Sequence, residues 1–262
     1  MNLFSQVYNA IQSGTTVSLV TLLTCPDCKA ANEGQMLLLY SDGSVEGVLI
    51  DEQFTQYVIQ KIAEFTWKQP TLIDLSYEDK QGYKLFWDQP ATKNKAVIFG
   101  AGHISKYLVD ALAMIDYEIT VVDDRPDFAN EQNFPQAERV VLTSFKQALA
   151  ELCPQVDEHT AIIIVTRGHQ YDLQCLRAAI KTKAGYLGMI GSKSRIKATL
   201  EILSEEGVAE EMLNRLHAPI GLNIGAQTPA EVALSIAAEV VGVFYGRSGG
   251  PMSIAGGIRH GC

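Results

Sequence analysis

The sequence predicts an α/β protein in which a doubly wound parallel sheet is preceded by a smaller α+β domain. From residue 95 onward, short apolar runs alternate with helix-spaced segments, which is typical of parallel strands joined by crossover helices. A glycine turn follows the first of these runs. Before residue 90, the Asp42-Gly43 dipeptide separates two strand-like segments, which indicates an antiparallel hairpin.

The smaller domain is expected at residues 1–90. Apolar residues at helical spacing predict a helix over Leu3–Ile11, and β-branched or apolar runs predict the strands. The remaining expected elements are strands at Val17–Thr24, Met36–Tyr40, Ser44–Ile50, Thr71–Leu75 and Tyr83–Trp87, with a helix at Phe54–Phe65. Asp88–Asn94 contains Pro90 and has no apolar pattern, so we expect it to be the linker.

The second domain, expected at residues 95–245, opens with a strand, a glycine turn and a helix. Ala96–Phe99 predicts a buried strand, and Gly100-Ala101-Gly102 turns the chain into the helix. A second strand ends at Asp123, 21 residues after Gly102, where a Rossmann fold places a carboxylate that binds ribose. The free amides at the start of the helix attract a phosphate.

Two positions modify this fingerprint. Ser105 replaces the third glycine, so we expect the helix to lie slightly farther from the sheet. His103 falls on the first helical turn. It is either a hydrogen-bond donor to the anion or an ordinary exposed residue.

The rest of this domain repeats the strand and helix pattern. The expected strands are Glu118–Val122, Arg139–Leu142, Thr160–Val165 and Ala184–Ile190; the expected helices run from a Ser144 cap to Leu152, over Tyr171–Lys181, from a Ser192 cap to Leu203, and over Pro229–Phe244. Thr228 and Glu231 have the spacing of a capping box before the last helix. Residues 246–262 are glycine-rich and expected to form a surface tail, from which Arg259 and His260 could reach a site.

Cationic residues follow two of the predicted strands. Thr166-Arg167-Gly168-His169 comes after one, and Gly191-Ser192-Lys193-Ser194-Arg195 comes after the next. Carboxyl ends of parallel strands meet at the edge where α/β sheets bind ligands, so these side chains are candidates for anion binding. Each of them, taken singly, is equally well explained as a solvated charge or a helix cap.

Composition excludes several classes of function. The formal charge of −9 and the pI of about 5.1 argue against a nucleic-acid partner. No apolar run approaches the length of a membrane helix, and the first residues do not resemble a signal peptide, so we expect a cytoplasmic protein. Five cysteines fit a reducing compartment better than a disulfide framework.

Cys25 and Cys28 form a CxxC pair in a loop after a predicted strand. No second CxxC or HxxxH completes a tetrahedral zinc site, and no thioredoxin-like context supports a redox pair. We interpret the pair as incidental or structural, with metal binding, sulfur handling and redox chemistry left as alternatives.

Several stretches together resemble the XdhC/CoxI family, the accessory factors of xanthine dehydrogenase and related molybdenum hydroxylases. They are GAGHISKYLVDAL, VVDDRPDFAN, TRGHQYD, YLGMIGSKSR and HAPIGLNIGAQTPAEVALSIAAEVV, in order over residues 95–245. The resemblance implies a Rossmann-like domain that binds molybdenum cofactor, as molybdopterin or its dinucleotide. It also implies help with sulfuration and insertion into a molybdenum hydroxylase client, with a cysteine desulfurase as a second candidate partner. The apolar, small-residue helix at Pro229–Phe244 favours a homodimer.

The glycine turn, the acids and cations at the strand ends, and the family motifs together give the candidate cofactor-binding residues, which are Gly100, Ala101, Gly102, His103, Asp123, Asp124, Arg125, Thr166, Arg167, His169, Gly191, Ser192, Lys193, Arg195 and Asn223. The amino-terminal domain departs from the family. The family's glycine-glycine-cysteine segment would fall near Gly47–Asp51, where this chain has no cysteine. Either Cys25 or Cys28 replaces it, or this member lacks the corresponding step.

Two other functions are compatible with the sequence. The first is an NAD(P)-dependent oxidoreductase, in which Asp123 would favour NAD over NADP. Its only apparent proton-transfer pair is His169 with Asp172, which is also explained by helix capping. The second is a scaffold that has lost its ligand and keeps client and dimer surfaces, the latter on the small-residue helix Pro229–Phe244.

Overall fold

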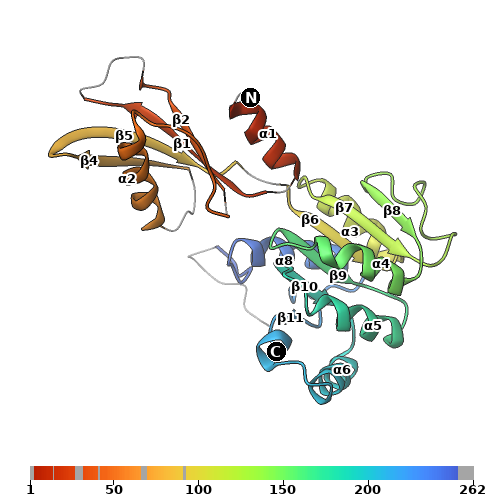
Figure 1. The fold of residues 1–262 in the computed structure, drawn as a ribbon. Coiled ribbons are helices and arrows are strands. Elements are labelled where there is room, and N and C mark those ends of the chain that lie inside the picture. Colours follow the sequence, from red (N-terminus) through yellow and green to blue (C-terminus); the bar gives the residue numbers. More distant parts are fainter. Residues whose placement is uncertain are drawn as a thin grey trace. The chain divides into compact units, whose positions relative to one another are not determined.

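A computed structural model describes residues 3–13, 15–26, 32–40, 42–65, 70–90 and 93–252. The chain divides into two compact units, Met1–Lys93 and Asn94–Cys262, which we treat separately (Figure 1). The end of the predicted tail, including Arg259 and His260, lies outside the described residues.

The first unit is a five-stranded antiparallel sheet with a helix packed on each face. The strand order is β3-β2-β1-β5-β4. Leu37 contributes to the core beneath one helix and Leu38 to the core beneath the other, because neighbouring strand residues point to opposite faces. The elements are α1 (Leu3–Ser13), β1 (Val17–Thr24), β2 (Met36–Tyr40), β3 (Val45–Gly47), α2 (Glu52–Ala63), β4 (Thr71–Tyr77) and β5 (Lys80–Asp88).

Strand β3 ends three residues earlier than predicted. Gly47 has φ of +95°, and a Cβ there would lie 2.3 Å from the carbonyl oxygen of Met36. Ile50 then adopts φ of +60°, which is rare for a β-branched residue. Asp51 caps α2 by accepting a hydrogen bond from the Phe54 amide at 2.8 Å. The chain therefore leaves the sheet at Gly47 and turns directly into the helix.

The second unit contains a six-stranded parallel sheet in the order β11-β10-β9-β6-β7-β8, which confirms the predicted fold class. Its elements are β6 (Lys95–Phe99), α3 (His103–Ala113), β7 (Glu118–Asp123), β8 (Arg139–Leu142), α4 (Phe145–Leu152), the 3-10 helix η2 (Cys153–Gln155), β9 (Thr160–Ile164), α5 (His169–Ala179), β10 (Tyr186–Met189), α6 (Lys193–Glu205), α7 (Glu210–Leu213), β11 (Leu216–His217) and α8 (Pro229–Phe244).

Helices cover both faces of this sheet. In β6, Ala96 and Ile98 pack into the core that α3 and α8 share, whereas Val97 and Phe99 pack against α4, α5 and α6. The strand is thus buried on both sides, as its unbroken apolar run predicts.

Local sequence signals set several helix ends as predicted. Ser144 and Ser192 cap α4 and α6, and Thr228 with Glu231 forms the capping box of α8. Helix α5 begins two residues earlier than predicted, because extended Gly168 serves as its N-cap.

The strand order reverses between β6 and β9. From β6 the chain continues outward through β7 and β8, then returns to the other side of β6 and builds β9, β10 and β11. Ligands of open α/β sheets bind at the carboxyl ends of the strands flanking such a reversal. Here those ends lead into α3 and α5.

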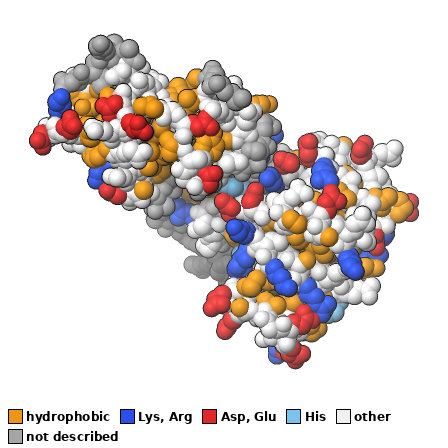
Figure 2. All heavy atoms as spheres, in the orientation of Figure 1, with side chains coloured by type: hydrophobic (Ala, Val, Ile, Leu, Met, Phe, Trp, Pro, Cys, Tyr) orange, Lys and Arg blue, Asp and Glu red, His pale blue; other side chains and the backbone are white. Residues whose placement is uncertain are grey.

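None of the described helices is both long and apolar enough to span a bilayer. On the face shown in Figure 2, acidic and basic side chains are interspersed on both units.

Candidate functional site

The turn after β6 is built by backbone contacts that only glycine permits. Gly100 has φ of +111°, and a Cβ there would lie 2.5 Å from the carbonyl oxygen of Val165, the residue that follows β9. Its amide donates to the Val122 carbonyl at 2.8 Å. The turn is therefore bonded to β7 and in close contact with the end of β9.

Ser105 explains how the turn tolerates the loss of the third fingerprint glycine. Its side chain is fully buried, and its hydroxyl donates to the carbonyl oxygen of Gly100 at 2.6 Å. The serine thus ties the first turn of α3 to the glycine turn and satisfies its own hydroxyl.

The amino end of α3 is open. Gly102 is the N-cap residue, and no side chain caps the helix. A Cβ at Gly102 would meet no atom within 4 Å, and His103 beside it is exposed. The first amides of α3 have no intrahelical acceptor and no side-chain cap, so an anion can approach them over Gly102.

Asp123 lies beside this turn but is directed inward. Its carboxylate is 1 % exposed, and it accepts a hydrogen bond from the Ala101 amide at 2.8 Å. Arg125 donates three more, from its backbone amide at 3.1 Å and from Nε and Nη2 at 2.8 Å each. Asp123 therefore fastens the glycine turn to Arg125.

The ionisation of Asp123 reflects these partners. Burial would raise the pKa of the carboxyl group, but the hydrogen bonds from Arg125 and Ala101 and the nearby guanidinium charge lower the pKa to about 2. Asp123 is consequently ionised at neutral pH.

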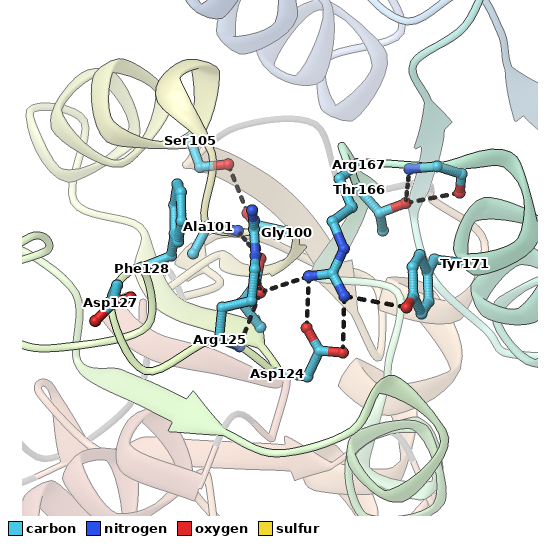
Figure 3. A network of polar contacts seen from close by, with 12 residues as sticks. Gly100, Ala101, Ser105, Asp124, Arg125, Asp127, Phe128, Thr166, Arg167 and Tyr171 are labelled. Atoms are coloured by element: carbon cyan, nitrogen blue, oxygen red, sulfur yellow. Dashed lines mark hydrogen bonds and ion pairs between the residues drawn. The ribbon is translucent and has the colours of Figure 1, made fainter.

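Arg125 and Arg167 approach the end of β7 from two sides (Figure 3). The guanidinium carbon of Arg125 lies 3.8 Å from the centre of the Phe128 ring. Arg167, from the loop after β9, donates to the two carboxylate oxygens of Asp124 at 2.7 and 3.1 Å and to the Tyr171 hydroxyl at 3.0 Å. Each arginine combines an ion pair with an aromatic contact, which orients its guanidinium plane.

A second network joins the loop after β9 to the first turns of α5 and α6. Buried Asp172 accepts hydrogen bonds from the Thr166 hydroxyl at 2.5 Å and from Nη2 of Arg195 at 2.7 Å. Burial raises the pKa of Asp172, while Thr166, Arg195 and His169 oppose that rise. The carboxylate thus joins the loop after β9 to helix α6, a role that its spacing from His169 did not reveal.

The remaining predicted residues lie on neighbouring loops. Lys193 is exposed and makes no hydrogen bond or ion pair with another described residue, while Ser192 caps α6. A Cβ at Gly191 would lie 3.3 Å from Ile196, so this glycine permits close packing. Asn223 is exposed in the loop after β11.

The loop that carries Asn223 has an anchor that sequence reasoning missed. Glu239 of α8 accepts hydrogen bonds from the Gly221 amide at 2.9 Å and from the Tyr186 hydroxyl. The only sequence signal was a single interior acid in an otherwise apolar helix.

The predicted cations are mostly neutralised. Arg125, Arg167 and Arg195 each pair with an aspartate, which leaves Lys193 as the cation among the predicted site residues with no carboxylate partner in the described chain. Each paired arginine still has N–H groups that make no hydrogen bond within the described residues. The carboxyl edge of the parallel sheet therefore offers oriented arginine N–H donors with little net positive charge.

The described residues contain no group of three or more His, Cys, Asp or Glu side chains able to hold a metal ion. Cys25 is buried and disulfide-bonded, and Cys28 lies outside the described residues. The interpretation of this pair as structural or incidental remains a prediction.

Several known proteins resemble this chain. The family model described as the XdhC Rossmann domain matches residues 96–240. The chain is 27 % identical over 267 residues to the uncharacterized protein YqeB of Escherichia coli (strain K12), covering 96 % of this chain and 48 % of that protein. It is 27 % identical over 161 residues to a protein of Bacillus subtilis (strain 168) named as a probable xanthine dehydrogenase subunit, covering 62 % and 46 %.

A third relative is the molybdenum cofactor insertion chaperone PaoD of Escherichia coli (strain K12), 34 % identical over 94 residues, covering 36 % of this chain and 30 % of that protein. A crystal structure described as a xanthine dehydrogenase from Bacillus halodurans superposes with a TM-score of 0.69 at 22 % identity, over 93 % of this chain and 67 % of that one, and supports the fold. The chain spans about half the length of the first two curated relatives. Because the family model covers more than half of its residues, the chain belongs to the XdhC family.

Proposed function

We propose that this protein binds molybdenum cofactor and assists its sulfuration and insertion into a molybdenum hydroxylase of the xanthine dehydrogenase type. Family membership supports this role, as do relatives named as a molybdenum cofactor insertion chaperone and a probable xanthine dehydrogenase subunit. A molybdenum hydroxylase is the proposed client, a cysteine desulfurase is the proposed sulfur source, and a homodimer is the proposed assembly.

The observation that carries the proposal is the open amino end of α3. Free amides at Gly102 and His103, with open space above Gly102, suit the phosphate group of the cofactor. Arg125, Arg167 and Lys193 would supply hydrogen bonds to phosphate or pterin oxygens. The bound group itself would supply the molybdenum and sulfur chemistry.

The described free thiols do not suit a sulfur-carrying role. Cys175 is fully buried, and burial raises its pKa, so the reactive thiolate is disfavoured. Burial also raises the pKa of half-buried Cys153. Among the described residues, this domain therefore has a role in holding and orienting the cofactor, and we propose that a partner supplies the sulfur.

The test is to purify the protein from a molybdenum-replete host, oxidise it, and measure bound pterin by fluorescence. We expect pterin with the wild type and none with Gly102→Asp. The extended backbone at Gly102 suits an aspartate N-cap, whose carboxylate would bond the α3 amides and repel a phosphate.

Thermal denaturation supplies the control. Gly102→Asp should be at least as stable as the wild type, because it adds a helix cap without a steric clash. Absence of pterin from the wild type, together with no binding of added molybdopterin in a calorimetric titration, would refute the proposed function.

A further inference from the structure

We infer that Arg125 occupies the ribose subsite of this Rossmann domain, so that the site selects a ligand ending in a phosphate monoester over one carrying a ribose diol. The inference rests on the proposed function and specifies the form of its ligand. It makes Arg125 a specificity-determining residue.

The hydrogen bonds that Asp123 accepts fill its acceptor capacity. An ionised carboxylate has about four lone-pair positions. Oδ2 accepts from the Ala101 amide and from Arg125 Nη2, and Oδ1 accepts from the Arg125 amide and Nε. A ribose hydroxyl that donated to Asp123 would have to displace one of these partners.

Contacts on its own loop hold Arg125 in place. Its guanidinium lies over Phe128, and its carbonyl oxygen accepts from the Phe128 and Ala129 amides at 3.1 and 2.9 Å. Asn133 donates to the Phe128 carbonyl and accepts from Lys106 of α3 at 2.7 Å. The loop that carries Phe128 is therefore tied to the helix whose amino end forms the phosphate site.

The neighbouring carboxylate, Asp124, is also occupied by an arginine. Both oxygens of Asp124 accept from Arg167, and Nη1 of Arg167 also lies 3.6 Å from Oδ1 of Asp123. Both acids at the end of β7 are thus bound by guanidinium groups. This part of the sheet edge presents N–H donors, which suit phosphate oxygens, whereas a ribose diol requires acceptors.

NADH and molybdopterin are the probes, titrated separately by fluorescence or calorimetry. In Arg125→Ala, Asp123 loses two side-chain donors and becomes available to ribose. We expect this variant to bind NADH at least about tenfold more tightly than the wild type, because a hydroxyl donor gains a charged acceptor. Its affinity for molybdopterin should fall, because a guanidinium donor is lost.

Two further variants serve as controls. Arg177→Ala removes an arginine that pairs with Glu206 on the outer side of α5, and it should leave both affinities unchanged. Arg125→Lys keeps the charge but loses the bidentate contact with the Asp123 carboxylate. Its NADH affinity should therefore lie between those of the wild type and Arg125→Ala. Circular dichroism checks that each variant is folded.

Tight NADH binding to the wild type, undiminished relative to Arg125→Ala, would overturn the inference even if molybdopterin binds. If molybdopterin fails to bind while Arg125→Ala still gains NADH affinity, the inference about the ribose subsite stands and the proposed function fails.

Discussion

Replacing Asp123 by asparagine tests whether this carboxylate holds the glycine turn together. Its pKa falls from 3.8 to about 2 in the folded protein. Because one pKa unit corresponds to about 1.4 kcal/mol, the ionised form stabilises the fold by about 2 kcal/mol more than the protonated form does. Asparagine can still accept from the Ala101 amide, but its NH₂ group cannot accept from Arg125. We expect Asp123→Asn to lose about 2 kcal/mol at pH 7.

The sign of the pH dependence follows from the lowered pKa. A carboxylate whose pKa is lower in the folded state stabilises the fold above its unfolded pKa, and the effect is lost as pH falls. The stability difference between the wild type and Asp123→Asn should be constant from pH 7 to about 5. It should shrink between about pH 4 and pH 2 as the wild-type carboxylate becomes protonated.

Urea denaturation followed by two signals is the assay. Both tryptophans, Trp67 and Trp87, lie in the part of the sequence that forms the first unit, before residue 94. The urea midpoint of their fluorescence is therefore an internal control, which the substitution should not change. Far-UV circular dichroism includes the helices of the second unit.

Asp124→Asn is the matched control. Because Asp124 is 29 % exposed, its loss should cost less than about 1 kcal/mol. If the free energy of unfolding of Asp123→Asn lies within about 0.5 kcal/mol of that of the wild type, the stabilising role given to Asp123 is wrong.

Two substitutions test the turn itself by thermal denaturation. Gly100→Ala should cost more than about 2 kcal/mol, because its backbone is left-handed and the new Cβ would clash with the Val165 carbonyl; a Tm equal to that of the wild type would contradict this geometry. Ser105→Ala should cost about 1 kcal/mol, because the Gly100 carbonyl loses a buried donor; an unchanged Tm would show that the carbonyl has another partner.

The elements that local sequence determines were predictable. Thr228, Pro229 and Glu231 set the start of α8, and the observed helix has the predicted bounds. The run Ala96–Phe99 predicted a strand buried on both faces, because an uninterrupted apolar segment needs cover on each side. In both cases the physical cause lies within a few neighbouring residues.

The elements that depend on distant contacts were not predictable. Strand β3 ends early because Gly47 approaches Met36 on the neighbouring strand. The spacing from Gly102 located Asp123 at the end of β7 but could not show which donors its oxygens bind. The pair formed by Asp124 and Arg167 joins residues 43 apart, so it depends on the strand order and not on local pattern.

The most direct test of an anion site at α3 is a titration of the ¹⁵N-labelled protein with inorganic phosphate, followed by amide chemical shifts. The account predicts saturable shifts at the amides of Gly102 and His103, accompanied by the side-chain Nε–H of Arg125, with the first unit unchanged. The Gly102→Asp variant should lose these shifts. Shifts confined to other residues, or an identical response in that variant, would contradict the account.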